Sequence, residues 1–172
     1  TGRYLDSIFD IILNFLFLRS ICHVSKTSLP ITLLAFFCIQ LQGTLYNYYY
    51  VILRNKSVGG DTTSKIFENK IPRALPGEDQ KIVTFLHQVY MIVYGLFDKI
   101  IHALDSDAYK AKTFPHWFMT FVSLYGLGFQ LLLIALMLAM DAIEYIAPFF
   151  IGYSVLIFVM IGIRKYFYPI QK

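Results

Sequence analysis

Charged residues are scarce in this sequence, and their scarcity excludes the ordinary class of soluble globular domains. Only 15% of the 172 residues are Asp, Glu, Lys or Arg, whereas a soluble domain usually carries about 25%. Hydrophobic residues make up 57% of the chain, and the mean hydropathy is +0.57. We therefore expect an integral membrane protein, with its many Phe and Tyr side chains near the lipid–water boundaries.

Cysteine is also rare, and the usual signatures of nucleotide-binding and hydrolytic enzymes are missing. The two cysteines, Cys22 and Cys38, fall in apolar segments, so we expect small buried side chains and no disulfide framework or metal site. The sequence contains no P-loop, nucleophile elbow or dinucleotide fingerprint. No motif indicates nucleic-acid binding, and basic residues at a membrane surface account for the net charge of +4.

The opening of the chain lacks the basic region and the cleavage pattern of a signal peptide. Position 1 is not Met, and two acids, Asp6 and Asp10, stand directly before an apolar run. From this we expect a chain trimmed at its start, or the C-terminal part of a longer protein.

Long apolar runs are present in place of the missing charge. A helix needs about 20 residues to cross the hydrocarbon of a bilayer. Pro30 and Pro115 mark the starts of two candidate helices, and a turn at Asp141–Glu144 separates the last two. The apolar segments are 5–24, 30–53, 82–104, 115–140 and 143–167.

Segment 82–104 differs from the other four because its polar residues gather on one side of a helical wheel. Such a division is typical of a helix that lies in the plane of the membrane interface. Its polar face carries Asp98, His102 and Asp105, which we expect to be solvated; a second metal site is the alternative.

The distribution of basic residues supports this assignment. If segment 82–104 lies flat, every Lys and Arg except Arg19 and Lys26 falls on one side of the membrane, which the positive-inside rule makes cytoplasmic. The predicted fold is an all-α, multi-pass membrane bundle forming one domain over 1–172. It has four transmembrane helices and one amphipathic interfacial helix, and its first helix begins on the cytoplasmic side.

Asp6 and Asp10 are the strongest candidates for chemistry. They are four residues apart, so they share one helix face and repel each other. An acid inside the bilayer costs about 2.5–3.5 kcal/mol, and a divalent cation held by both carboxylates would offset that cost. The alternative is that acids simply favour the positive N-terminal end of a helix, which accounts better for Asp6 than for Asp10.

Gly2, Asp6 and Asp10 form the pattern G-x-x-x-D-x-x-x-D before an apolar helix. This pattern resembles the second half of the signature of the CDP-alcohol phosphatidyltransferases, D-x-x-D-G-x-x-A-R-x8-G-x-x-x-D-x-x-x-D. In that family the signature joins the second and third of six membrane helices at the cytoplasmic face. The resemblance implies that this chain contributes the last four helices of a partial six-helix fold.

The resemblance also implies an activity and residue roles. These enzymes transfer a substituted phosphate from a CDP-alcohol to an acceptor alcohol with release of CMP, in phospholipid biosynthesis, and they use Mg²⁺ or Mn²⁺. Asp6 would be a metal ligand, Asp10 the general base and a further ligand, and Gly2 would allow close approach of the nucleotide. Family members form homodimers, which implies the same here, and the fragment alone would be inactive. The choice of CDP-alcohol and acceptor stays open.

Segment 30–53 and its end carry a polar stripe made of Gln40, Thr44, Asn47 and Arg54. In one interpretation these residues face a polar cleft, where Asn47 binds substrate and Arg54 holds a phosphate. In the other, the stripe bonds to neighbouring helices and Arg54 anchors the helix at the interface. Two further functions stay open: a transporter or channel fragment with an acid-lined pathway, and a structural membrane subunit.

Overall fold

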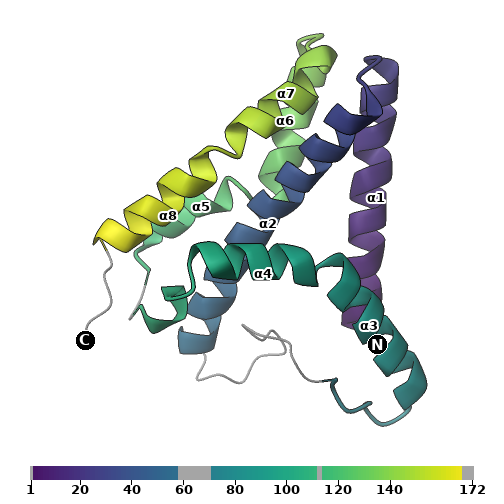
Figure 1. The fold of residues 1–172 in the computed structure, drawn as a ribbon, viewed down its shortest axis with the longest axis vertical. Helices are drawn as coiled ribbons and strands as arrows, with labels where there is room; N and C mark the ends of the chain where they lie inside the picture. Colours follow the sequence, from purple (N-terminus) through teal and green to yellow (C-terminus); the bar gives the residue numbers. More distant parts are fainter. Residues whose placement is uncertain (1, 58–70, 112–113, 168–172) are drawn as a thin grey trace.

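The computed structural model describes residues 2–57, 71–111 and 114–167, and every regular element in these ranges is helical. The predicted all-α class is therefore confirmed. In chain order the elements are α1 Gly2–Val24, α2 Leu29–Ser57, α3 Gln80–Val93, α4 Gly95–Leu104, η1 Ala108–Lys110, α5 His116–Ser123, α6 Leu127–Ala139, η2 Ile143–Tyr145, α7 Ile146–Tyr153 and α8 Leu156–Phe167 (Figure 1).

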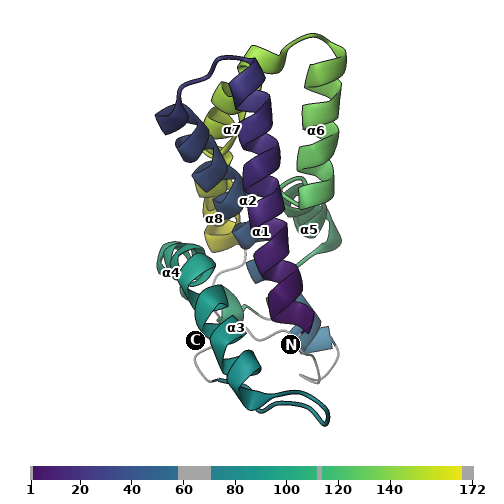
Figure 2. The same cartoon turned by 90° about the vertical axis from the view of Figure 1, so that its right-hand side faces the viewer.

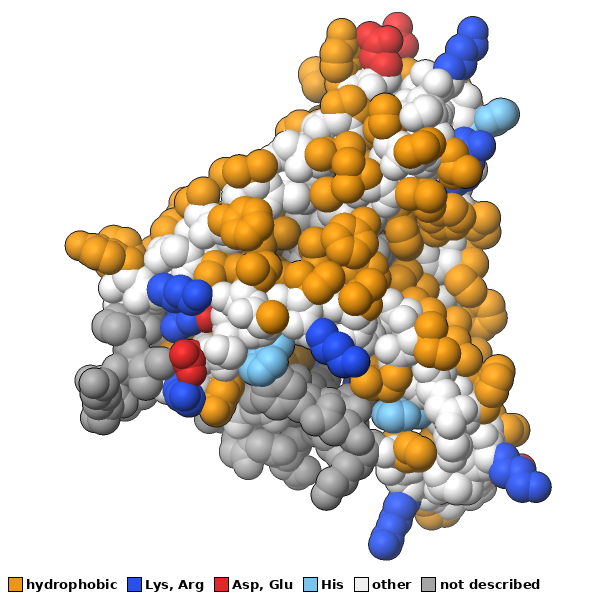
Figure 3. Space-filling model, in the orientation of Figure 1, with side chains coloured by type: hydrophobic (Ala, Val, Ile, Leu, Met, Phe, Trp, Pro, Cys, Tyr) orange, Lys and Arg blue, Asp and Glu red, His pale blue; other side chains and the backbone are white. Residues whose placement is uncertain are grey.

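Several helices are long and apolar enough to cross a membrane. Gly2–Val24, Leu29–Asn55 and Ile143–Phe167 meet this condition, and the pair α5 and α6 adds a fourth if the two count as one bent span. Large apolar side chains such as Leu13, Leu132 and Phe158 are exposed, as expected of a surface that faces lipid. Figure 3 shows hydrophobic side chains over the middle of one face, with charged side chains toward its upper and lower ends.

Helix α2 is the central element, because it contributes to both hydrophobic cores. One core joins α1, α2, α6 and α7 around Leu18, Ala35 and Phe150. The other joins α2, α4, η1, α5 and α8 around Tyr49 and Phe118. Helices α3 and α4 lie against the lower part of the bundle, where α3 contacts α1 and α4 contacts α2 (Figures 1 and 2).

Local sequence signals account for several helix ends. Pro30 falls in the first turn of α2, where its missing N–H costs nothing. Asp79 caps α3 by accepting a hydrogen bond of 2.7 Å from the N–H of Lys81. The α1–α2 connection turns through Lys26, whose φ of 56° lies in the left-handed region.

Two segments expected to be continuous are broken. Segment 82–104 forms α3 and α4, which meet at Tyr94 and Gly95. Segment 115–140 forms α5 and α6, which are bent by 49° relative to each other. At Gly126 the backbone is extended, and a Cβ there would lie 3.0 Å from the Ser123 carbonyl oxygen. Hydrophobic periodicity missed both breaks because the apolar pattern continues across them.

The prediction that Asp105 is solvated is wrong. Asp105 is fully buried, and its carboxylate forms an ion pair with Arg164 of α8, which is 2% exposed. Tyr49 of α2 donates a hydrogen bond of 2.7 Å to the same carboxylate, and Tyr48 donates one of 3.1 Å to the Asp105 carbonyl oxygen. Lys165 adds a bond of 2.9 Å to the Leu104 carbonyl oxygen. These bonds fasten the end of α4 to α2 and α8.

Candidate functional site

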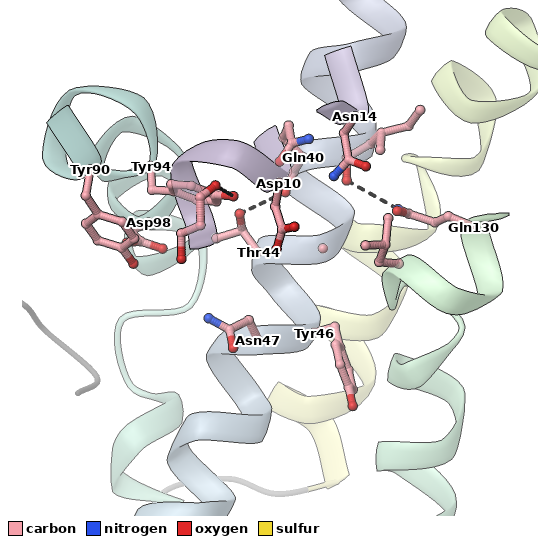
Figure 4. Close-up of a pocket in the computed structure, with 14 residues that line it drawn as sticks. Asp10, Asn14, Gln40, Thr44, Tyr46, Asn47, Tyr90, Tyr94, Asp98 and Gln130 are labelled. Carbon is pink, nitrogen blue, oxygen red and sulfur yellow. Dashed lines mark hydrogen bonds between the residues drawn. The ribbon is translucent and has the colours of Figure 1, made fainter. Parts of the chain in front are cut away.

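A cavity of about 340 Å³ lies between α1, α2, the α3–α4 pair and the start of α6. This volume is within the range of about 300–1,000 Å³ that small-molecule sites occupy. Figure 4 shows Asp10 at its centre, Thr44 and Asn47 from α2 below, and Tyr90, Tyr94 and Asp98 on one side. Eleven of the fourteen lining residues carry a polar side-chain group, so the cavity is suited to a hydrophilic ligand.

The α1 wall is formed by Ser7, Asp10 and Asn14, whose spacing of three and four residues places them on one helix face. Asp10 lines the cavity, whereas the acid-pair prediction placed both Asp6 and Asp10 at the site. Asp6 is exposed and is not one of the lining residues, because it lies about 40° farther round the helix at 3.6 residues per turn. Gly2 is outside the cavity too, with open space where a Cβ would stand.

The α2 wall contains three of the four residues in the polar stripe. Gln40, Thr44 and Asn47 line the cavity, and the Thr44 hydroxyl donates a bond of 2.8 Å to the Gln40 carbonyl oxygen of its own helix. Three residues of the stripe thus share one cavity with Asp10. Arg54 is exposed, about 10 Å farther along the helix than Asn47 at 1.5 Å per residue, and it does not line the cavity.

Gln42 and Gln130, which the sequence analysis missed, form hydrogen bonds that join helices beside the cavity. Gln42 is fully buried and donates to the Phe150 carbonyl oxygen at 3.0 Å and to the Ser154 hydroxyl at 2.8 Å. Gln130 lines the cavity and donates to the Gln42 side-chain oxygen at 3.0 Å. Together the two amides fix α2, α6 and α7 around the inner side of the cavity.

The α3–α4 wall carries Tyr90, Tyr94 and Asp98, which the sequence analysis did not assign to the site. The two tyrosine rings stack with centroids 5.1 Å apart. The Tyr94 hydroxyl donates a hydrogen bond of 2.9 Å to the Ser7 carbonyl oxygen and so ties this wall to α1. The repeat of four residues between Tyr90, Tyr94 and Asp98 is a signal that could have identified this wall.

The electrostatic environment of the cavity is negative. Burial, and then the nearby carboxylates of Asp10, Asp98 and Asp6 together with the Tyr90 phenol, raise the pKa of Tyr94 above its ordinary value. Among the described residues, the cavity is lined by two acids, Asp10 and Asp98, and by no Lys, Arg or His. Such a site attracts cations and repels anions that arrive without a bound cation.

The residues present fit part of a Mg²⁺ or Mn²⁺ site. In the described ranges no three His, Cys, Asp or Glu side chains are grouped so as to hold a metal. Mg²⁺, however, commonly takes one or two carboxylates, several waters and the phosphates of its substrate. Asp6 and Asp10, one turn apart and exposed at the start of α1, supply oxygen ligands of that kind.

We compared the chain with protein-family models, with curated proteins and with solved structures, and none of them matches it.

Proposed function

We propose that this chain belongs to a membrane-embedded CDP-alcohol phosphotransferase, which transfers a substituted phosphate to an acceptor alcohol and releases CMP. The observation that carries the proposal is the position of Asp10. It is the last acid of the G-x-x-x-D-x-x-x-D pattern, and it stands on the wall of a polar cavity next to an apolar bundle. A reaction between polar groups of a lipidic substrate needs a polar cavity that lies beside the membrane.

The chemistry assigns Asp10 the role of general base. The acceptor oxygen forms a new bond to the phosphorus that carries the donor alcohol. The bond from that phosphorus to the bridging oxygen breaks, and CMP leaves with the bridging oxygen and its electron pair. The acceptor proton passes to the Asp10 carboxylate. Proton transfer of this kind typically raises the rate by about 10²–10⁴-fold.

Asp6 and Asp10 would hold Mg²⁺ or Mn²⁺, and the ion would supply positive charge to neutralise and orient the diphosphate. Asn47 lines the cavity and is placed to bind the substrate there. Gly2 leaves open space at the start of α1, which favours close approach of the nucleotide. Arg54, exposed near the end of α2, would contact a phosphate outside the cavity.

The proposed topology has four transmembrane spans, with α5 and α6 forming one bent span. Helices α3 and α4 then lie at the cytoplasmic surface, where the positive-inside rule places the basic residues. Their exposed apolar side chains, Phe85 and Ile92 among them, support contact with the membrane. The site opens on the same side.

The hydrogen bonds of the inner wall favour an enzyme over a transporter or channel. Gln42 and Gln130 would be natural linings of a conduction path, yet their amides are bonded to each other and to neighbouring helices. The cavity is therefore closed on that side by packing, as expected of a substrate site.

The test is an assay of CMP release by the full-length gene product in membranes or proteoliposomes, with and without Mg²⁺. Asp10→Asn is expected to reduce turnover by about 10²–10⁴-fold because it removes the proton acceptor. Asp141→Asn is the matched control. Asp141 is exposed at the far end of α6, and its φ of 56° suits Asn equally well. Equal turnover in the wild type and Asp10→Asn would refute the assignment of the base.

A further inference from the structure

The parts of the cavity differ in chemistry. Asp10 of α1 stands at the centre, with Thr44 and Asn47 of α2 below it, and the proposed function assigns the reacting hydroxyl to Asp10 (Figure 4). On one side are a carboxylate, Asp98, and the rings of Tyr90 and Tyr94 (Figure 4). A ligand that fills the cavity therefore meets Asp10 at the centre and an acid with aromatic rings on that side.

An acid beside tyrosine rings is a suitable environment for a positively charged nitrogen. The faces of aromatic rings attract ammonium groups, and quaternary ammonium ligands are recognised in this way. A carboxylate adds a full negative charge. In contrast, a phosphate at this wall would meet Asp98 and, among the described lining residues, no basic side chain.

We propose that the wall formed by Tyr90, Tyr94 and Asp98 binds the cationic nitrogen of a small amino alcohol, so that Asp98 determines substrate class. This proposal rests on the proposed function for the role of Asp10, and it names the compound that the site receives. The amino alcohol is either the free acceptor or the head of the CDP-linked donor; both bring the same ammonium group.

The wall is held firmly enough to discriminate between ligands. Tyr94 is bonded to the Ser7 carbonyl oxygen, and Tyr90 packs on Tyr4 of α1 with ring centroids 5.3 Å apart. One turn farther on, Phe97 packs on Phe37 of α2, again with centroids 5.3 Å apart. Asp98 follows Phe97 directly and lies one turn after Tyr94, so the helix that carries Asp98 is in contact with both α1 and α2 just before it.

The first experiment measures equilibrium binding to the purified full-length gene product by calorimetry, in detergent or nanodiscs. The probes are choline, ethanolamine, glycerol phosphate and 3,3-dimethylbutan-1-ol, which has the shape of choline but no charge. Choline is expected to bind roughly tenfold more tightly or better, since its charge faces rings and a carboxylate. Glycerol phosphate is expected to bind more weakly than choline. Equal affinity for choline and its neutral isostere, or no binding of choline and ethanolamine, overturns the proposal.

Asp98→Asn tests the residue assignment while preserving the shape of the side chain. The variant is expected to lose most of the preference for choline over the neutral isostere, and its affinity for the isostere should change little. Glu144→Gln is the matched control, because Glu144 is exposed in η2, beyond the far end of α6, and should leave the preference intact. An unchanged preference in Asp98→Asn shows that other groups recognise the ligand and overturns the assignment.

The turnover assay separates this proposal from the proposed function. One arm supplies CDP-diacylglycerol with a free amino alcohol, and the other supplies a CDP-amino-alcohol with diacylglycerol. Turnover in either arm supports both proposals and identifies the source of the amino alcohol. Turnover only with phosphorylated acceptors supports the phosphotransferase and overturns the amino-alcohol site. Choline binding that depends on Asp98 without any CMP release supports the site and refutes the phosphotransferase.

Discussion

The ion pair between Asp105 and Arg164 permits the sharpest prediction about stability. Both side chains are buried, with exposed fractions of 0% and 2%. The Asp105 carboxylate also accepts hydrogen bonds of 2.7 Å from Tyr49 and 2.8 Å from the Arg164 Nε. Each charge has its partner in the protein, so removal of one charge leaves the other buried without compensation.

Asp105→Asn is expected to destabilise the protein by about 3–5 kcal/mol, the usual cost of breaking a buried pair from one side. Arg164→Met should have a similar cost because it leaves the carboxylate unpaired. The loss of stability in the double variant should be much smaller than the sum of the losses in the two single variants, because it leaves no uncompensated charge. A coupling of more than about 1 kcal/mol is the direct signature of the pair.

Thermal unfolding of the detergent-solubilised protein measures this effect. At about 2–4 °C per kcal/mol for a domain of this size, Asp105→Asn should lower the Tm by roughly 6–20 °C. The control is Asp107→Asn, two residues away. Asp107 pairs with Lys110 at 2.7 Å, but the side chains are 44% and 45% exposed. Exposed pairs contribute about 0–1 kcal/mol, so this variant should unfold almost like the wild type.

Two results would refute the reasoning about the pair. If Asp105→Asn unfolds within a degree or two of Asp107→Asn, water reaches Asp105 and the pair is not buried in the working protein. If the effects of the two single variants simply add in the double variant, Asp105 and Arg164 act independently and the contact contributes no coupling.

Two smaller changes test the bend and the wall of the cavity. Gly126→Ala should lower the free energy of unfolding by about 1–3 kcal/mol, because the new Cβ meets the Ser123 carbonyl oxygen at 3.0 Å. Gly128→Ala is the control and should have little effect, because nothing lies within 4 Å of its Cβ position. Tm measurements compare the two variants, and equal losses would show that the bend tolerates a side chain. Tyr94→Phe removes the hydrogen bond to Ser7, so its free energy of unfolding at neutral pH should fall by about 0.5–1.5 kcal/mol. The raised pKa of Tyr94 means that the folded state holds its phenolic proton more tightly, so this group stabilises the fold below about pH 10 and the contribution is lost as pH rises beyond that value. Phenolate absorbance of the wild type minus Tyr94→Phe should show ionisation above pH 10; ionisation at the ordinary value would contradict the burial of Tyr94.

The helices were predictable because the length of an apolar run can be read from the local sequence alone. The segments that begin near Leu5 and Pro30 correspond to α1 and α2, and the long apolar run after Ile143 corresponds to η2, α7 and α8. The bend at Gly126 was not predictable from hydropathy. The Tyr46 ring, 80 residues earlier in the chain, lies 3.6 Å from the place of a Gly126 Cβ, and hydropathy carries no information on such a contact.

The candidate site was predicted on α1 and α2 and missed on α3 and α4 for a similar reason. Spacing on a single helix placed Gln40, Thr44 and Asn47 together, and these residues do share the cavity. The same reasoning placed Asp6 with Asp10, but only Asp10 lines the cavity. A helical wheel cannot tell which other helix covers a polar face. It therefore treated Asp105 as solvated, although Arg164, far away in the sequence, lies against it.

Two sets of contacts hold the helix that carries Asp98, one on each side of this residue. The Tyr94–Ser7 bond lies one turn before Asp98, and the Asp105–Arg164 pair lies two turns after it, at the end of α4. A change at Asp105 should thus loosen the far end of α4 before it disturbs the cavity. Loss of the Tyr94 hydroxyl acts at the cavity itself, although the ring remains to face a cation. Stability and ligand preference should therefore respond differently: Asp105→Asn mainly lowers the Tm, whereas Asp98→Asn mainly changes selectivity. This separation is expected because the Tyr94–Ser7 bond and the Phe97–Phe37 contact hold the cavity end of α4 independently of the Asp105–Arg164 pair.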